Sequence, residues 1–141
     1  MEKIEMQTFF PPRISADTKA FWEGCKAHKL LLQRCRHCGK VIWPAQYLCP
    51  DCLSEDLELT EMSGRGTVYS WEVFRRAFHP AMEGKLPYVV AAVDLEEGAR
   101  MITNLVDCEL GQLRCGLPVE LRWCDGDEYT RPVFVIRRDE K

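Results

Sequence analysis

Four cysteines in two C-x2-C pairs constrain the fold of this chain more than any other feature of its sequence. Cys35 and Cys38 form the first pair, and Cys49 and Cys52 form the second after ten intervening residues. The two residues inside each pair let both sulfurs turn inward, so the pairs together can supply a tetrahedral set of four thiolates. A set of this kind is typical of a closed, structural zinc site. The pattern therefore predicts one zinc ion bound by these four side chains.

The alternative interpretation of these cysteines is a pair of disulfides or a set of free thiols. Residues 1–8 are mixed and charged, without the apolar segment of a secretory signal. We therefore expect a cytoplasmic protein, whose thiols stay reduced and whose paired C-x2-C motifs act as metal ligands. The remaining four cysteines are scattered and are expected to be small buried or half-buried side chains: Cys25, Cys108, Cys115 and Cys124.

The composition is that of a globular protein rather than a disordered or membrane-spanning one. Its 141 residues are 46% hydrophobic and 29% charged. No apolar run approaches the roughly 18 residues that a membrane span requires. The formal net charge of -3 and the pI of about 5.7 argue against a general nucleic-acid binder, which needs a positive field.

The pattern of apolar residues divides the chain into three expected parts. Residues 1–29 form an N-terminal arm and helix, residues 30–60 a zinc ribbon, and residues 61–141 a β-barrel. An extended segment at 30–33 leads into the first cysteine pair and another at 41–43 leads away from it, which is the order of a zinc ribbon. About 30 residues cannot bury a sufficient core, so the metal is expected to supply the missing stability.

The N-terminal part combines an apolar arm with a short helix. Phe9 and Phe10, which two prolines follow, would be costly to expose, so we expect them to pack on this chain or on a partner. A helix is expected over residues 15–29, with Ser15 or Asp17 as its cap. A helix this short must pack on something. Three residues share one of its faces at helical spacing: Phe21, Trp22 and Cys25.

The C-terminal part has the signals of a small sheet. Strict alternation places Tyr69, Trp71 and Val73 on one face, the core face of the first strand. The second strand is almost continuously apolar and is expected to be buried on both faces. Five strands with glycines at the corners fit a small closed barrel, of which the OB-fold is the best-known case. The expected strands are residues 67–73, 87–93, 100–106, 119–123 and 133–136.

A helix, a four-cysteine ribbon and a five-stranded barrel in this order resemble the DUF35 family. These are small OB-fold proteins with a rubredoxin-like zinc ribbon that associate with acyl-CoA enzymes. The resemblance extends from about Phe21 to Phe134, and it departs at Leu53, where relatives often have glycine. Only turn geometry is affected by that departure. The matching segments are Leu30–Cys38, Cys49–Cys52, Gly64–Ser70, Pro87–Val90, Leu95–Gly98, Asn104–Val106 and Gly116–Val119.

The resemblance implies an accessory role in an enzyme complex. Family members look like non-catalytic partners of thiolase-fold enzymes, including lipid-transfer-protein-like thiolases and aldolases. The small subunit of benzoylsuccinyl-CoA thiolase is of this type. For this chain the resemblance implies a hetero-oligomer with a thiolase-fold or lipid-transfer-protein-like catalytic subunit that acts on an acyl-CoA. Several aromatic residues outside the barrel pattern suit a partner surface: Phe9, Phe10, Phe21, Trp22 and Trp43.

No catalytic residue is assigned, because the sequence has no G-x-S-x-G, no Gly-rich phosphate loop and no H-E-x-x-H. His37 lies inside the first cysteine pair and is expected to face solvent. Coenzyme A, as acyl-CoA or CoA, would need fixed cations for its phosphates. The alternative interpretation is that such cations only form a solvent-exposed face of the protein. The candidates near the first barrel loop, where OB-folds often bind ligands, are Arg65, Arg75, Arg76 and His79.

Two other functions remain open at this point. A single-stranded nucleic-acid binder of the zinc-ribbon and OB-fold type would need stacked aromatics on a basic groove. The acidic pI and the expected burial of Tyr69 and Trp71 argue against it. An iron-binding electron-transfer protein would use the same four cysteines, as in rubredoxin. The ten residues between the cysteine pairs are few for that family.

Overall fold

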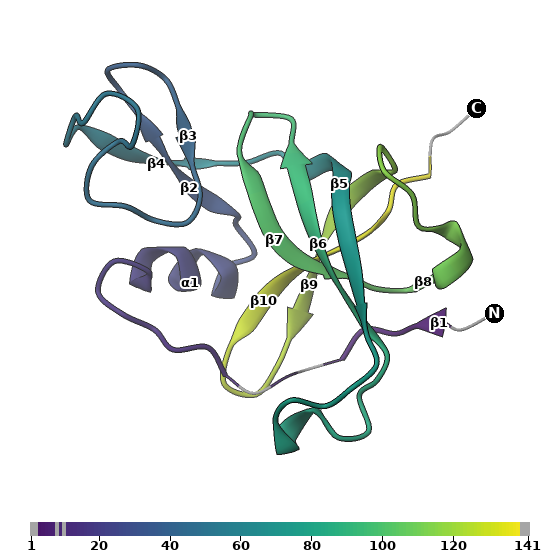
Figure 1. Cartoon of the computed structure of the whole chain (residues 1–141). Coiled ribbons are helices and arrows are strands. Elements are labelled where there is room, and N and C mark those ends of the chain that lie inside the picture. Colours follow the sequence, from purple (N-terminus) through teal and green to yellow (C-terminus); the bar gives the residue numbers. More distant parts are fainter. Residues whose placement is uncertain (1–2, 8, 10, 139–141) are drawn as a thin grey trace.

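The computed structural model describes residues 3–7, 9 and 11–138, and Figure 1 shows how its elements are arranged. In the described part of the chain, a small three-stranded sheet lies beside a closed five-stranded barrel. The helix α1 (Lys19–Lys26) lies below the small sheet in this view. No helix among the described residues is long and apolar enough to cross a membrane.

The small sheet is the zinc ribbon expected around the cysteine pairs. It consists of β2 (Leu31–Cys35), β3 (Val41–Ile42) and β4 (Leu57–Glu61), in the antiparallel order β3-β2-β4. β2 and β3 correspond to the extended segments predicted on either side of the first cysteine pair. β4 has no counterpart among the predicted strands, because its residues are half-buried or exposed without regular alternation. It pairs with β2 along all five of its residues.

The barrel has the closed strand order β10-β7-β6-β5-β9, which confirms the predicted five-stranded barrel. Neighbouring strands are antiparallel except β7 and β10, which are parallel and meet through Leu105 and Phe134. This parallel contact closes the barrel. The five strands are β5 (Arg65–Phe74), β6 (Tyr88–Leu95), β7 (Arg100–Leu105), β9 (Pro118–Asp125) and β10 (Thr130–Ile136). Single 3-10 turns occupy Pro80–Met82 (η1) and Leu110–Gln112 (η2).

A β-bulge in β5 reverses the predicted orientation of Tyr69. The pairing register with β6 shifts between Val68 and Ser70, and the extra residue puts the two halves of the strand out of phase. Val68 is 2% exposed and belongs to the core, whereas Tyr69 is 52% exposed. Trp71 packs against the core as predicted. Tyr69 therefore no longer argues against nucleic-acid binding, whereas the packing of Trp71 and the acidic charge still do.

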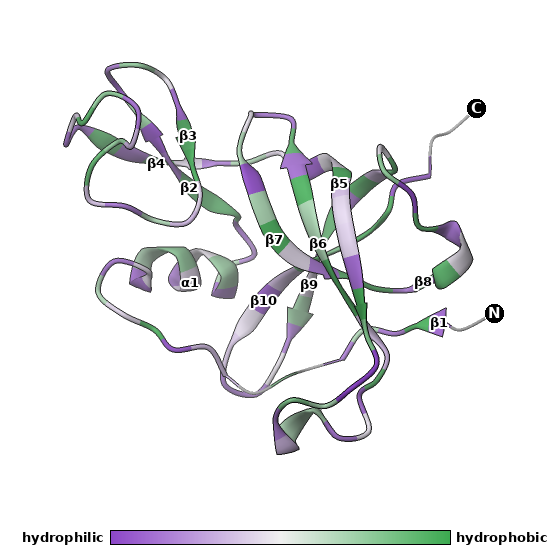
Figure 2. Ribbon diagram, viewed as in Figure 1, coloured by the Kyte–Doolittle hydropathy of each residue, from purple (hydrophilic) through white to green (hydrophobic). Residues whose placement is uncertain are grey.

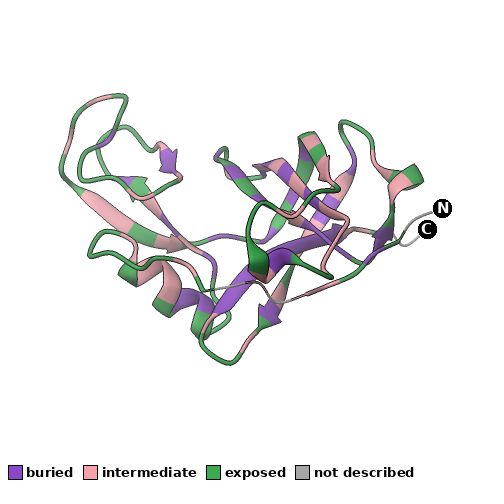
Figure 3. Cartoon of the chain, turned by 60° about the horizontal axis from the view of Figure 1, so that its bottom comes forward, coloured by how far each residue is buried: buried purple, intermediate pink, exposed green. Residues whose placement is uncertain are grey.

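β6 is half-covered rather than buried on both faces, which corrects a second prediction. Its residues alternate strictly between buried and half-buried positions. The continuous apolar run hides this alternation, because alanine and valine serve equally well on a half-covered outer face. Figure 3 shows how the buried residues concentrate in the barrel strands. The core side of β6 carries Val89, Ala91, Val93 and Leu95.

The helix is shorter than predicted and lacks the predicted cap. It begins at Lys19, after Thr18, and no side chain at its start accepts a hydrogen bond from its first turn. The Ser15 hydroxyl donates instead to the carboxylate of Asp17, so both candidate caps are used outside the helix. The helix ends two residues before His28, whose φ of 61° lies in the left-handed region and turns the chain.

The N-terminal arm is attached to the barrel. β1 (Lys3–Ile4) pairs with β8 (Cys108–Glu109), and Ile4 is only 1% exposed. The Phe9 ring packs edge-on against Tyr88, with 5.3 Å between the ring centroids. Phe9 therefore packs on this chain's own barrel. Phe10, the second phenylalanine of the predicted apolar arm, lies outside the described residues.

One apolar core joins the ribbon to the barrel. Leu30, Leu32 and Val41 of the ribbon belong to the same buried cluster as Phe134 and Val119 of the barrel. In Figure 2 apolar residues, coloured green, occur in strands of both the ribbon and the barrel. A second cluster lies where the arm covers β9 and β10. There Met6 packs against Val106, Cys124, Val133 and Val135.

Candidate metal centre and binding surfaces

The four predicted zinc ligands come together in the ribbon. The sulfurs of Cys35 and Cys52 are 3.5 Å apart, as are those of Cys38 and Cys49, and all four lie within 4.8 Å of one another. A tetrahedral zinc ion with Zn–S bonds of about 2.3 Å would place its sulfurs about 3.8 Å apart. The donor set and its spacing therefore fit one structural zinc ion. Among the described residues, no other group of three or more metal-ligating side chains gathers in this way.

Tight backbone turns aim both sulfurs of each pair inward. The amide of Gly39 donates to the carbonyl oxygen of Cys35, and the amide of Leu53 donates to that of Cys49, both at 2.8 Å. Gly39 and Leu53 occupy equivalent places and both have left-handed backbones, with φ of 83° and 67°. Leu53 therefore keeps the turn that glycine would make, at a cost on the order of 1 kcal/mol.

The electrostatics of the cluster call for a cation. The amide of Cys38 lies 3.4 Å from the sulfur of Cys35 and, against the effect of burial, lowers the pKa of Cys35 to about 6. At Cys52 the amide of Ser54 lowers the pKa, but burial and the three neighbouring sulfurs outweigh it and raise the value to about 12. Four sulfurs this close cannot all be thiolates unless a metal ion compensates their charge.

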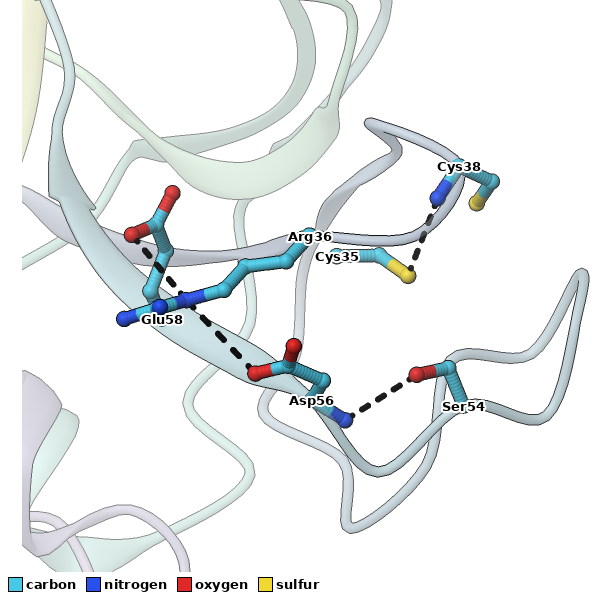
Figure 4. Close-up of polar contacts among 6 residues, drawn as sticks. All are labelled: Cys35, Arg36, Cys38, Ser54, Asp56 and Glu58. Atoms are coloured by element: carbon cyan, nitrogen blue, oxygen red, sulfur yellow. Dashed lines mark hydrogen bonds and ion pairs between the residues drawn. The ribbon is translucent and has the colours of Figure 1, made fainter.

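Ion pairs attach the first cysteine turn to β4, as Figure 4 shows. The Nε of Arg36 lies 3.5 Å from a carboxylate oxygen of Asp56 and 3.3 Å from one of Glu58. The side chain of Ser54 accepts a hydrogen bond from the amide of Asp56 at 3.1 Å. These groups are solvent-exposed, so each pair contributes little stability. Their effect is to fix the position of the cysteine turn relative to β4.

The other histidines and cysteines do not extend the metal centre. His37 is exposed and is not a member of the cluster. His28 joins the end of α1 to β9: its Nε2 lies 2.9 Å from a carboxylate oxygen of Asp125, and its ring stacks on Trp123 at 5.3 Å. Cys25, Cys108 and Cys124 are buried as expected, whereas Cys115 is exposed in the turn before β9.

The candidate CoA-phosphate residues do not form one cluster. Arg65 begins β5, whereas Arg75 and Arg76 follow its last residue, so a ten-residue strand of about 33 Å separates them. The guanidinium of Arg76 lies over the ring of Phe78 at 5.8 Å. Nδ1 of His79 accepts a hydrogen bond from the amide of Ala81 and so caps η1. Three of the four residues thus share the β5–β6 loop, and Arg65 lies at the other end of the barrel.

An apolar groove of about 270 Å³, called here the helix–ribbon groove, lies between α1 and the ribbon. Phe21, Trp22 and Trp43 line it together with Leu59, which is 49% exposed. Further large apolar side chains are exposed elsewhere on the ribbon, namely Tyr47, Leu48 and Leu53. The charged residues that line the helix–ribbon groove are Asp17 and Glu58, and no described cation lines this groove. Apolar grooves of this kind are common where proteins bind partners.

A second hollow, of about 300 Å³ and called here the arginine hollow, lies where the arm crosses the barrel. Phe9, Trp22, Tyr88 and Tyr129 line it, and Arg131 borders it. Trp22 thus borders both this hollow and the helix–ribbon groove. Burial lowers the pKa of Arg131. Arg131 was not among the predicted site residues, and its sequence signal is a cation within an otherwise largely apolar strand.

Family models for the two domains of ChsH2 match the chain in the order observed in the structure. The rubredoxin-like zinc ribbon domain matches residues 22–58, and the C-terminal OB-fold domain matches residues 59–124. A solved structure described as the Ltp2-ChsH2(DUF35) aldolase contains a similar chain. It superposes with a TM-score of 0.80 at 40% identity, covering 89% of this chain and 98% of that one.

Three curated relatives are similar over most of this chain. A probable enoyl-CoA hydratase alpha subunit of Thermomonospora curvata is 42% identical over 87% of this chain. This chain spans only 38% of that relative's length. A DUF35 domain-containing scaffold protein of Methanocaldococcus jannaschii is 37% identical, over 70% of this chain and 71% of its own. The benzoylsuccinyl-CoA thiolase subunit BbsA of Thauera aromatica is 35% identical, over 85% of this chain and 78% of its own.

Proposed function

This chain belongs to the DUF35 family, and on that premise we propose that it is a non-catalytic accessory subunit of an acyl-CoA enzyme. Its partner is a thiolase-fold or lipid-transfer-protein-like catalytic subunit, which it binds and supports in a hetero-oligomer. The names of its relatives describe a scaffold protein, a thiolase subunit, a hydratase subunit and an aldolase component. Two of these names describe subunits and one describes a scaffold, which supports a role within a complex.

The observation that carries this proposal is the open helix–ribbon groove. Aromatic side chains at its walls are the residue types that dominate the energetics of protein interfaces. Exposed leucine and tyrosine side chains elsewhere on the ribbon add further apolar surface. Such a surface is costly to leave in water, and a partner protein that covers it gains that free energy.

The zinc ion has a structural role in this proposal. Four cysteine ligands complete a tetrahedron, so no position is left for water or substrate. The ion would hold the ribbon in the conformation that presents the groove. When bound, it supplies no reactive group to the acyl-CoA.

A contribution to the CoA site is the finer part of the proposal. Arg75, Arg76 and His79 share the β5–β6 loop, a part of OB-folds that commonly contacts ligands. Guanidinium groups suit phosphates because they donate two hydrogen bonds in a fixed fork. Arg65, at the far end of β5, would need a separate role. Double substitution of Arg75 and Arg76 by glutamine should then raise the KM for the acyl-CoA in the assembled complex.

Co-expression with thiolase-fold enzymes from the same genome tests the partnership. Wild-type chain should co-elute with one of them on size exclusion and change its acyl-CoA thiolysis or aldol cleavage. Leu59→Asp, in the groove, should weaken assembly at least about tenfold, which corresponds to about 1.4 kcal/mol. Ile102→Asp is the matched control, because Ile102 is also 49% exposed but lies on the barrel. A chain that ignores every such enzyme, or that cleaves acyl-CoA unaided, would end the proposal.

A further inference from the structure

Arg131 on β10 is a buried cation without a carboxylate partner. Its side chain donates from Nη1 to Oδ1 of Asn104 at 2.5 Å and from Nη2 to the carbonyl oxygen of Gln7 at 2.6 Å. Both acceptors are neutral. Arg131 is only 8% exposed, and its Nε is buried with no hydrogen-bond partner. Among the described residues, no carboxylate forms an ion pair with it.

This arrangement is unfavourable for the folded chain by itself. Buried charges in proteins are usually paired or bound to a metal, because desolvation of an isolated charge is costly. A well-packed apolar side chain at position 131 would avoid that cost. Departures from such rules that nothing in the fold offsets tend to mark functional sites. The positive charge of Arg131 therefore calls for a counter-charge that this chain does not supply.

The arginine hollow beside this cation is otherwise apolar. Arg131 is the one charged side chain among its described lining residues. The rings of Trp22, Tyr88 and Tyr129 reach it from the helix, from β6 and from the β9–β10 turn. Phe9 lies under the guanidinium, with its centroid 4.4 Å from Cζ. Figure 1 shows the arm passing the β9–β10 turn on its way to α1, which brings these segments together.

The charged side chains at the arginine hollow are positive, and carboxylates line a neighbouring hollow. Nζ of Lys85 lies 5.8 Å from the centroid of the same Phe9 ring and adds a second cation. Asp127 and Glu128 line only the neighbouring hollow, beyond Tyr129. The helix–ribbon groove has the opposite character, since its charged lining residues are both acidic. Among the described lining residues, the charge within the arginine hollow itself is positive and favours an anion, whereas that of the helix–ribbon groove is negative.

We propose that the arginine hollow binds an amphipathic anion, a molecule with one oxyanion group and a flat apolar body. The oxyanion would receive hydrogen bonds from Arg131, whose guanidinium has five N–H donors, of which two go to Asn104 and Gln7 and one to the Tyr129 side chain. The apolar body would lie among the aromatic rings. Asn104 positions the guanidinium, since its own amide is fixed by donating to the carbonyl oxygen of Val89 at 2.9 Å. This site is additional to the proposed partnership and does not depend on it.

Calorimetric titration of the zinc-loaded full chain with 2-naphthoate and 2-naphthamide tests the site. The two probes share a ring system and differ in charge. Naphthoate should bind with one site per chain and at least about tenfold more tightly than the amide, a difference of about 1.4 kcal/mol. Its affinity should fall as salt is added. Equal affinity for both probes, or binding of neither, would overturn the proposal.

Two substitutions locate the binding. Val90→Trp fills the hollow from β6 without changing Arg131 and should abolish naphthoate binding. Ala92→Trp is the matched control, because Ala92 is the next half-buried residue on the same strand and lies outside the hollow. Arg131→Met should reduce naphthoate binding to the level of the amide, and circular dichroism checks that this variant folds. If Arg131 only fastens the arm, Val90→Trp and Ala92→Trp will behave alike, and the proposal is wrong.

Competition then identifies the source of the anion. If coenzyme A displaces naphthoate, the oxyanion is a phosphate of a CoA ligand. If only carboxylic acids displace it, the ligand is a free apolar acid. Both results support an anion site, and they assign it differently. The titration uses this chain alone, so failure of the partnership and failure of this site give separate results.

Discussion

Removing the zinc ion should unfold the tip of the ribbon. The tip has its own small cluster of three buried residues, Cys35, Ile42 and Cys49, in which only Ile42 has a large apolar side chain. Burial of Ile42 contributes about 1.5–3 kcal/mol. Ordering the backbone of the ten residues between the cysteine pairs costs about 10–20 kcal/mol. A structural zinc ion contributes about 10–16 kcal/mol in zinc-finger peptides, which closes this difference.

The base of the ribbon should respond differently from its tip. Leu30 and Leu32 are buried in the core that the ribbon shares with the barrel, so they do not need the ion. Hydrogen exchange of the chain with and without a strong chelator measures both parts. Amides in residues 36–56 should exchange at least about 100-fold faster after chelation, a loss of about 2.8 kcal/mol or more of local stability. Amides of the barrel strands should change by less than about threefold.

A matched pair of variants separates loss of the ion from loss of any cysteine. Cys49→Ser removes a buried ligand and should reproduce the effect of the chelator. Cys115→Ser changes an exposed cysteine outside the ribbon and should leave exchange as in the wild type. If elemental analysis confirmed zinc loss and residues 36–56 kept their protection, the energetic reasoning would be refuted. Equal loss of protection in the barrel would refute the separation of tip from base.

Three further predictions concern the barrel and the helix. Gly66→Ala should lower the free energy of unfolding by about 1–3 kcal/mol, because a Cβ there would lie 2.5 Å from the carbonyl oxygen of Asp94; an unchanged denaturation midpoint would contradict this. The hydrogen bond from His28 lowers the pKa of Asp125 in the folded chain. The stability that this contact contributes is therefore fully present above the unfolded-state pKa of about 3.9, and it is lost as the pH falls through the lowered folded-state pKa. An NMR titration of His28→Ala should find the Asp125 pKa raised, and an unchanged value would exclude the contact. Burial raises the pKa of Cys25 to about 12, so iodoacetamide should label Cys115 and spare Cys25 in the folded chain, whereas equal labelling would mean that α1 opens.

The metal cluster and the barrel could be predicted because each follows from a local pattern. The C-x2-C spacing alone brings two sulfurs together, and alternation marks most of the barrel strands. The orientation of Tyr69 could not be predicted, because a bulge arises from pairing with β6 and leaves no trace in the alternation of β5. β4 was not predicted for a related reason: it is recognisable as a strand from its pairing with β2 and not from the pattern of its own residues.

The surroundings of Arg131 depend on contacts that are remote in sequence. Its two hydrogen-bond partners lie 27 and 124 residues away along the chain. The candidate CoA residues illustrate the opposite error. Arg65 and Arg75 are close in sequence, but an extended strand carries them to opposite ends of the barrel. Distance along the chain is therefore a poor guide to distance in space. Residues remote in sequence can be in contact, and residues close in sequence can be separated by an extended strand.

The indole of Trp22 borders the helix–ribbon groove on one side and the arginine hollow on the other. Its ring contacts Phe21 at 5.0 Å and Tyr129 at 5.8 Å, one neighbour for each side. A single side chain therefore forms a shared wall between two surfaces of opposite charge. An occupant of either surface that turns this ring alters the shape of the other. Thermodynamic linkage makes such an effect reciprocal, so the two occupancies would raise or lower each other's affinity by the same factor.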